Sequence, residues 1–207
     1  MGTFLAFYIH RGEKDAAVME AVRTLYPKVV FEQVPNFIAA ALSGDDFPLP
    51  EQKLADLSVA SATDVIGLAY QGAAGSFMFH HWRGGVQLRC LWYGCEEEGC
   101  WDRVEGQAEP WEQAYFWSPE ALKNALLYEE DQGRRQQMER FWKDATLVKG
   151  ETMPSICAED TVHAVMEHYR LFGEEPVAPQ DNPPSAVAPP VEAAAKPKSF
   201  WSRLFGQ

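Results

Sequence analysis

The chain has 207 residues, 46% of them hydrophobic and 23% charged, which indicates one globular domain, or one domain with an appendage. Its 18 basic and 30 acidic residues give a formal net charge of -12. So acidic a chain argues against binding to nucleic acid, whose phosphate backbone requires a basic surface. The sequence has no apolar run approaching the roughly 18 residues that would predict a membrane span.

The first part of the chain predicts a β-α-β unit. Residues 3–9 form a short apolar run rich in aromatics, typical of a buried strand, and the charge at Arg11 comes too early for a signal peptide. Apolar residues recur at helical spacing over 13–25, Pro27 ends that helix, and residues 28–34 predict a second strand. The crossover between the two strands is short but permits parallel pairing.

An antiparallel meander is the clearest pattern of the middle region. Residues 37–42 are interpreted as one or two helical turns, and a helix at 51–60 and a strand at 64–71 follow. Three aromatic and β-branched runs then alternate with turns that contain glycine, which predicts antiparallel strands. Those three strands are residues 76–82, 86–93 and 100–105.

The region after the meander is predicted to be helical. Ser118-Pro119-Glu120 is a strong start signal, because serine caps free amides, proline fits the first helical position and glutamate suits the positive helix end. Two further helices are expected at residues 132–144 and 159–172. The predicted fold class is α+β: an N-terminal β-α-β unit leads into an antiparallel β-meander that C-terminal helices cover on one face.

The composition of the chain changes at Glu174. Seven of the 14 prolines lie beyond it, among alanine, valine and glutamate, so this segment predicts a disordered, extended Pro/Ala-rich tail. We therefore expect one globular domain at residues 1–173, a flexible linker at 174–197 and an aromatic-basic peptide at 198–207.

The C-terminal peptide is the most informative feature for function. If residues 199–205 become helical, one face carries four large apolar side chains, and basic residues surround it. So short a helix is marginal alone in water and is expected to form only when another surface buries its apolar face. That surface is a protein partner, an anionic membrane or the chain's own domain, or else the tail has no role. Because the basic residues are few, a protein partner is favoured over lipid. The apolar residues are Phe200, Trp201, Leu204 and Phe205, and the basic ones are Lys196, Lys198 and Arg203.

The four cysteines are too few for a disulfide scaffold. So few cysteines indicate a reducing compartment, and the cytoplasm is the expected location. Cys90, Cys95 and Cys100 are spaced C-x4-C-x4-C, whereas structural zinc sites use close pairs such as C-x2-C. They are interpreted as strand and turn cysteines in a reducing compartment. Zinc, or a redox disulfide between Cys95 and Cys100, is the alternative.

Motifs for catalysis or cofactor binding are missing from the sequence. His80 and His81 are adjacent in a predicted strand, so they point to opposite faces and cannot share a metal. The sequence contains neither a nucleotide-binding loop nor a serine-nucleophile elbow, and no cofactor, metal or catalytic residue is predicted. The glutamates at 96–98 are interpreted as a solvated turn tip. Most tryptophans are expected in the core, but Trp111 is expected to be exposed to a partner.

The leading hypothesis is a cytoplasmic, non-enzymatic protein-interaction module, adaptor or regulatory, with a tethered docking peptide. Its partner-binding residues would be Phe200, Trp201, Arg203, Leu204, Phe205 and Trp111. One alternative is a peripheral membrane protein that the same peptide anchors weakly. Another is an enzyme of unrecognised type, with a pocket between sheet and helices that uses His80 or His81 together with Arg89 and Glu105.

Overall fold

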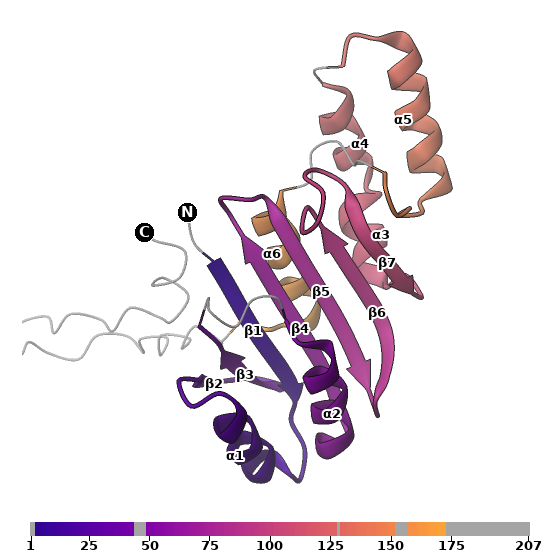
Figure 1. Cartoon of the computed structure of the whole chain (residues 1–207). Coiled ribbons are helices and arrows are strands. Elements are labelled where there is room, and N and C mark those ends of the chain that lie inside the picture. The colour runs from indigo at the N-terminus through magenta and orange to yellow at the C-terminus, as the bar shows by residue number, and fades with distance from the viewer. Residues whose placement is uncertain (1–2, 44–48, 128, 152–156, 173–207) are drawn as a thin grey trace, which may run out of the picture.

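Figure 1 shows the computed structural model, which describes residues 3–43, 49–127, 129–151 and 157–172. The predicted α+β class is confirmed: seven strands form one antiparallel sheet with helices on both faces. The elements are β1 (Thr3–His10), α1 (Asp15–Leu25), β2 (Val30–Val34), β3 (Phe37–Ala41), α2 (Glu51–Ser61), β4 (Asp64–Gln71), β5 (Ser76–Arg83), β6 (Val86–Tyr93), β7 (Trp101–Gly106), α3 (Pro110–Phe116), α4 (Pro119–Leu126), α5 (Gln132–Asp144) and α6 (Ala158–Tyr169).

The sheet is buried on both faces, and strand β1 shows why its sequence is apolar throughout. Phe4 and Tyr8 point to one face, whereas Leu5 and Phe7 point to the other, because successive strand residues alternate. Helices α3 and α6 cover the first face, which confirms the predicted cover by C-terminal helices. Helices α1 and α2 cover the second face, in front of the sheet in Figure 1.

The strand order is β2-β3-β1-β4-β5-β6-β7, and it changes the predicted N-terminal unit. The prediction of helical turns at 37–42 is wrong, because Phe37–Ala41 is strand β3. Pro35 and Asn36 form a two-residue turn that brings Phe37 opposite Val34, and pairing to two strands outweighs the helix propensity of the alanines. Strands β1 and β2 are parallel, but β3 lies between them, so they do not pair directly.

Helix α3 was not predicted, whereas the cap of α4 was. Glu109 and Glu112 form a reciprocal capping box at the start of α3, and Pro110 occupies its first turn. At α4 the Ser118 hydroxyl accepts a hydrogen bond of 3.1 Å from the Ala121 amide, as the start signal predicted. Among the described residues, the helices are all too short or too polar to cross a bilayer.

Candidate functional site

The first of three candidate sites is a cluster of polar side chains around His81, on the face of the sheet that α3 and α6 cover. Its Nδ1 lies 2.6 Å from Glu109 Oε1, and its Nε2 lies 3.5 Å from Asp64 Oδ1, an ion-pair distance. The Tyr169 hydroxyl of α6 donates to Glu109 Oε2, and Arg83 binds Asp64 through two nitrogens. Four segments far apart in the sequence therefore meet at one histidine.

A buried ion pair extends this cluster toward β6. The Arg89 guanidinium donates to both carboxylate oxygens of Glu112, at 2.8 and 2.6 Å. Its remaining nitrogen donates to the carbonyls of Glu105 and Gly106. Glu112 also accepts the Glu109 amide, which joins the ion pair to the capping box of α3. This two-nitrogen geometry is the strong form of the pair and holds α3 against the sheet.

The pKa shifts of Tyr169 and Asp64 follow from their contacts in this cluster, in which His81 Nε2 is buried and makes no hydrogen bond to the described residues. Burial raises the pKa of Tyr169, and the carboxylate of Glu109 adds to the rise, so the phenol keeps its proton and donates it. Burial alone would raise the pKa of Asp64, but the hydrogen bond and charge of Arg83 and the charge of His81 bring it below its ordinary value. Every group named here contacts another member, so the cluster joins β4, β5, α6 and the start of α3.

The second candidate lies on the opposite face, around His80. The Trp92 indole N–H donates to His80 Nε2 at 2.9 Å, and the Arg103 guanidinium lies 4.7 Å from the centre of the Trp92 ring. Arg103 also binds Glu51 of α2 and Glu105 of β7. Burial, and secondarily the charge of Arg103, lowers the pKa of His80 to about 3. The ring is therefore neutral and accepts the indole proton.

This burial predicts a pH dependence of stability. Because the pKa of His80 is about 3 in the folded chain and near 6.5 when unfolded, the unfolded chain alone binds the proton between these values. We expect the stabilisation that the buried, neutral His80 ring contributes to the free energy of unfolding to be complete above about pH 6.5. It should decline as the pH falls toward 3, because protonation of His80 then favours the unfolded chain. Urea unfolding of the wild type and His80→Gln at several pH values measures it: the variant should lose part of the decline.

The control for this prediction is His10→Gln, at the exposed end of β1. That variant shows how far the loss of a histidine outside the His80 cluster changes the pH dependence of the unfolding free energy, and the change in His80→Gln should exceed it. A His80→Gln curve parallel to the wild-type curve would contradict the burial of a neutral ring.

The residues of the enzyme alternative are divided between these two clusters. His81 is paired with Arg89 across β5 and β6, on the face of α3 and α6. His80 and Glu105 belong to the other face, where both lie beside Arg103. The structure therefore does not bring the four residues together in one pocket. Asp64, Glu109 and Tyr169, which complete the His81 cluster, carry no sequence motif that would have revealed them.

The cysteines and the acidic turn behave as strand and turn residues. Burial raises the pKa of Cys95 to about 12, so its thiol stays protonated, and it donates to the carbonyls of Phe77 and Tyr93. The glutamates at 96–98 are exposed, which confirms the solvated tip. Asp102 instead is buried and accepts three backbone amides of the turn. Across the described ranges, no group of three or more His, Cys, Asp or Glu side chains could hold a metal ion.

The expected exposure of Trp111 is wrong, because this side chain is 2% exposed. The capping box starts α3 at Pro110, and the resulting helix turns Trp111 onto Phe79, with ring centres 5.3 Å apart. Its indole donates to Glu109 Oε2 at 3.0 Å. Trp111 is therefore a core residue of the folded domain. The other predicted partner-binding residues, Phe200, Trp201, Arg203, Leu204 and Phe205, lie outside the described residues.

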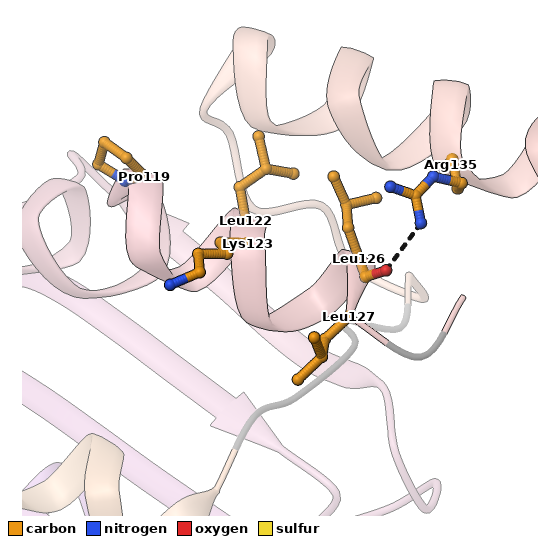
Figure 2. A pocket seen from close by; sticks show the side chains of 6 residues that line it. All are labelled: Pro119, Leu122, Lys123, Leu126, Leu127 and Arg135. Carbon is orange, nitrogen blue, oxygen red and sulfur yellow. Dashed lines mark hydrogen bonds between the residues drawn. The ribbon is translucent and has the colours of Figure 1, made fainter. Parts of the chain in front are cut away.

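The third candidate is a hollow between α4 and α5, which lie beyond the end of the strands β6 and β7 in Figure 1. Figure 2 shows Leu122 and Leu126 pointing from α4 toward α5, whereas Leu127 points away from α5. Arg135 reaches back from α5 and donates to the Leu126 carbonyl at 2.8 Å. The hollow has a volume of about 500 Å³ and is lined by Pro119, Leu122, Lys123, Leu126, Leu127 and Arg135.

Comparisons with models of known protein families, with curated proteins and with solved structures found no match to this chain. The candidate sites are therefore weighed on their geometry.

Proposed function

We propose that this protein is a cytoplasmic, non-enzymatic interaction module, which binds a protein partner through the α4–α5 hairpin and contacts it again through the peptide 198–207. Helix α4 carries the proposal. Its apolar side chains Ala121, Leu122, Ala125 and Leu126 are only half-buried, the first three of them against the core, and Leu127 directly after the helix is 61% exposed. Apolar side chains that stay half-exposed beside an exposed leucine are typical of a surface that another molecule covers.

The chemistry of the hollow indicates the kind of partner. Leucine side chains form its floor, and burying an exposed leucine contributes roughly 1.5–3 kcal/mol. Lys123 and Arg135 also line it and are cations on a chain whose net charge is -12, although Lys123 is paired with Glu120 at 3.3 Å. An acidic segment with apolar side chains fits this combination, because its charge meets the two basic groups while its apolar residues cover the leucines.

Catalysis has weaker support than binding. The His81 cluster is bound up in holding α3 and α6 to the sheet, and the His80 cluster holds α2 to β7 through Arg103 and Glu51. Groups with such partners stabilise the fold, whereas a catalytic group needs a free position toward substrate. The α4–α5 hollow has open apolar surface instead.

The tail supports a second contact with the same partner. A linker of about 24 residues at 174–197 spans roughly 25–30 Å as a coil and up to about 70 Å when extended as polyproline II. A tether of this length raises the local concentration of the peptide near a bound partner. The hairpin contact and the peptide contact together then bind the partner with a higher affinity than either contact alone.

Leu127→Asp should abolish recovery of the partner by the full chain. This side chain is 61% exposed, so the substitution leaves the fold intact while it places a charge in the apolar surface beside the hollow. The matched control is Val86→Asp at the start of β6, whose side chain is also 61% exposed. Quantitative affinity purification, with thermal melts of both variants, measures the difference.

Equal recovery by Leu127→Asp and Val86→Asp would contradict the role of the hairpin. A chain that ends at Glu175 should keep the fold and lose most of the recovered partner, and unchanged recovery would remove the tail from the proposal. The membrane alternative is separated by sedimenting the full and the shortened chain with anionic vesicles. Binding that depends on the tail and on anionic lipid would favour the membrane.

A further inference from the structure

The two edges of the sheet differ in how far they are closed. At β7 the Trp101 amide and carbonyl bind the Glu151 carbonyl and the Gly150 amide, and Arg89 takes the carbonyls of Glu105 and Gly106. Within the described residues, β2 pairs only with β3, so its outer backbone groups form an open edge. An open edge is a template for one more strand.

A half-buried acid, Glu32, lies in the middle of that open strand. Its Oε2 atom is buried and accepts no hydrogen bond from any residue that the structure describes. Glu32 lies in one cross-strand row with Ala39 and Tyr8, and within the described ranges the buried Tyr8 hydroxyl also makes no hydrogen bond. Leaving a buried acceptor unsatisfied costs about 1–3 kcal/mol, so a donor that reached Glu32 would be stabilising.

The pattern of β2 is matched by the C-terminal peptide. Val30, Glu32 and Val34 alternate onto one face, an apolar-acidic-apolar sequence at two-residue spacing. In an extended conformation, Trp201, Arg203 and Phe205 also share one face, an aromatic-basic-aromatic sequence at the same spacing. Because both triplets are symmetric, Arg203 can lie opposite Glu32 whether the peptide runs parallel or antiparallel to β2.

We propose that residues 200–205 of this chain add to the open edge of β2 as an eighth strand, with Arg203 donating to Glu32. The backbone groups of β2 then find partners, and the aromatic side chains cover Val30, which is 55% exposed in the described chain. An arginine beside a half-buried carboxylate supplies the missing donor and a neutralising charge.

A second copy of the chain fits this edge less well. An antiparallel pair of two β2 strands about a two-fold axis through their centres places Glu32 opposite its own copy. Like charges directly opposite each other destabilise a strand pair. The charge of β2 therefore favours a basic occupant over another β2.

The path of the chain allows the peptide to reach its own domain. Helix α6 ends at Tyr169, whose ring centre lies 6.5 Å from that of Phe37, next to the β2–β3 turn. About 27 residues (173–199) separate the described end from Phe200 and span roughly 26–31 Å as a coil, more than the ~17 Å length of a five-residue strand. This docking does not depend on the proposed partner, but it would compete with that partner for the same six residues.

Hydrogen exchange of the full chain tests this docking. The amides of β2 that point away from β3 should exchange at least about 10-fold more slowly than in a chain that ends at Pro197. Arg203→Glu should abolish that protection, and combining it with Glu32→Arg should restore it. Lys198→Glu makes the same charge change outside the triplet and should keep the protection.

Three results would overturn the proposal. They are equal exchange of β2 in the full and shortened chains, equal loss in Lys198→Glu and Arg203→Glu, and protection that rises with protein concentration. The last result would assign the edge to a second copy. Both tail variants change residues beyond the described domain, so a failure to fold does not obscure the outcome. If the full chain recovers no partner while the amides of β2 remain protected from exchange, the interaction module is contradicted and the docking of the tail is not.

Discussion

Arg89→Met should lower the free energy of unfolding by about 3–5 kcal/mol, because it leaves Glu112 as a buried carboxylate without its counter-charge. The two side chains are only 4% and 2% exposed, so water cannot replace the lost guanidinium. The loss would reach α3 as well, because Glu112 also accepts the Glu109 amide. Urea or guanidinium unfolding, followed by circular dichroism, measures the change.

The paired substitution separates the ion pair from its surroundings. Combining Arg89→Met with Glu112→Leu removes both charges and should recover most of the loss, since an apolar pair of similar volume often replaces a buried ion pair at little cost. The two bonds from Arg89 to the Glu105 and Gly106 carbonyls stay lost in both variants. A double variant no more stable than Arg89→Met would show that these carbonyl bonds dominate.

Gly106→Ala should destabilise the fold by about 3 kcal/mol or more, since it adds a clash with backbone to an unfavourable backbone conformation. Gly106 has φ +82°, and an added Cβ would lie 2.0 Å from the Leu88 carbonyl oxygen. The end of β7 would have to move away from β6, which would also disturb the Arg89 contact with Gly106. Chemical unfolding measures the loss of stability, and hydrogen exchange of β6 and β7, followed by mass spectrometry, measures the separation of the two strands.

Gly84→Ala is the control for that prediction. Gly84 has φ +56°, but an added Cβ would meet no heavy atom within 4 Å. The variant therefore suffers only the cost of the left-handed backbone, about 1–2 kcal/mol. Equal destabilisation by the two substitutions would mean that the approach of Leu88 to Gly106 has no energetic weight.

The sequence predicted the meander well because its signals are local. Strands 76–82 and 86–93 match β5 and β6 to within a residue, since runs of aromatic and β-branched residues end at turns that need glycine. The helix at 132–144 matches α5 for the same reason, with Asp131 capping its first turn. The alanines of β3 lacked such a signal, because their helix propensity opposes the pairing that the folded sheet imposes.

The candidate site could not be predicted, because its parts are distant in the sequence. Glu109 and Tyr169 are separated from His81 by 28 and 88 residues, and no spacing rule links them. Trp111 shows the converse error: its place beside a proline and a glutamate indicates exposure, but the capping box directs it into the core. The apolar side of α4 follows from its spacing, yet only the fold shows that this side is left half-exposed and that Leu127 is 61% exposed.

Residue order alone established the α+β class, most element boundaries, the opposite directions of His80 and His81, and the composition break at Glu174. These follow from interactions within a turn or two of the chain, which a few neighbouring residues encode. Tertiary structure decided that β3 separates β1 from β2, that His81 meets Glu109, and that β2 is left as an open edge. Such outcomes depend on which distant surfaces bury one another, and local periodicity carries no record of that choice.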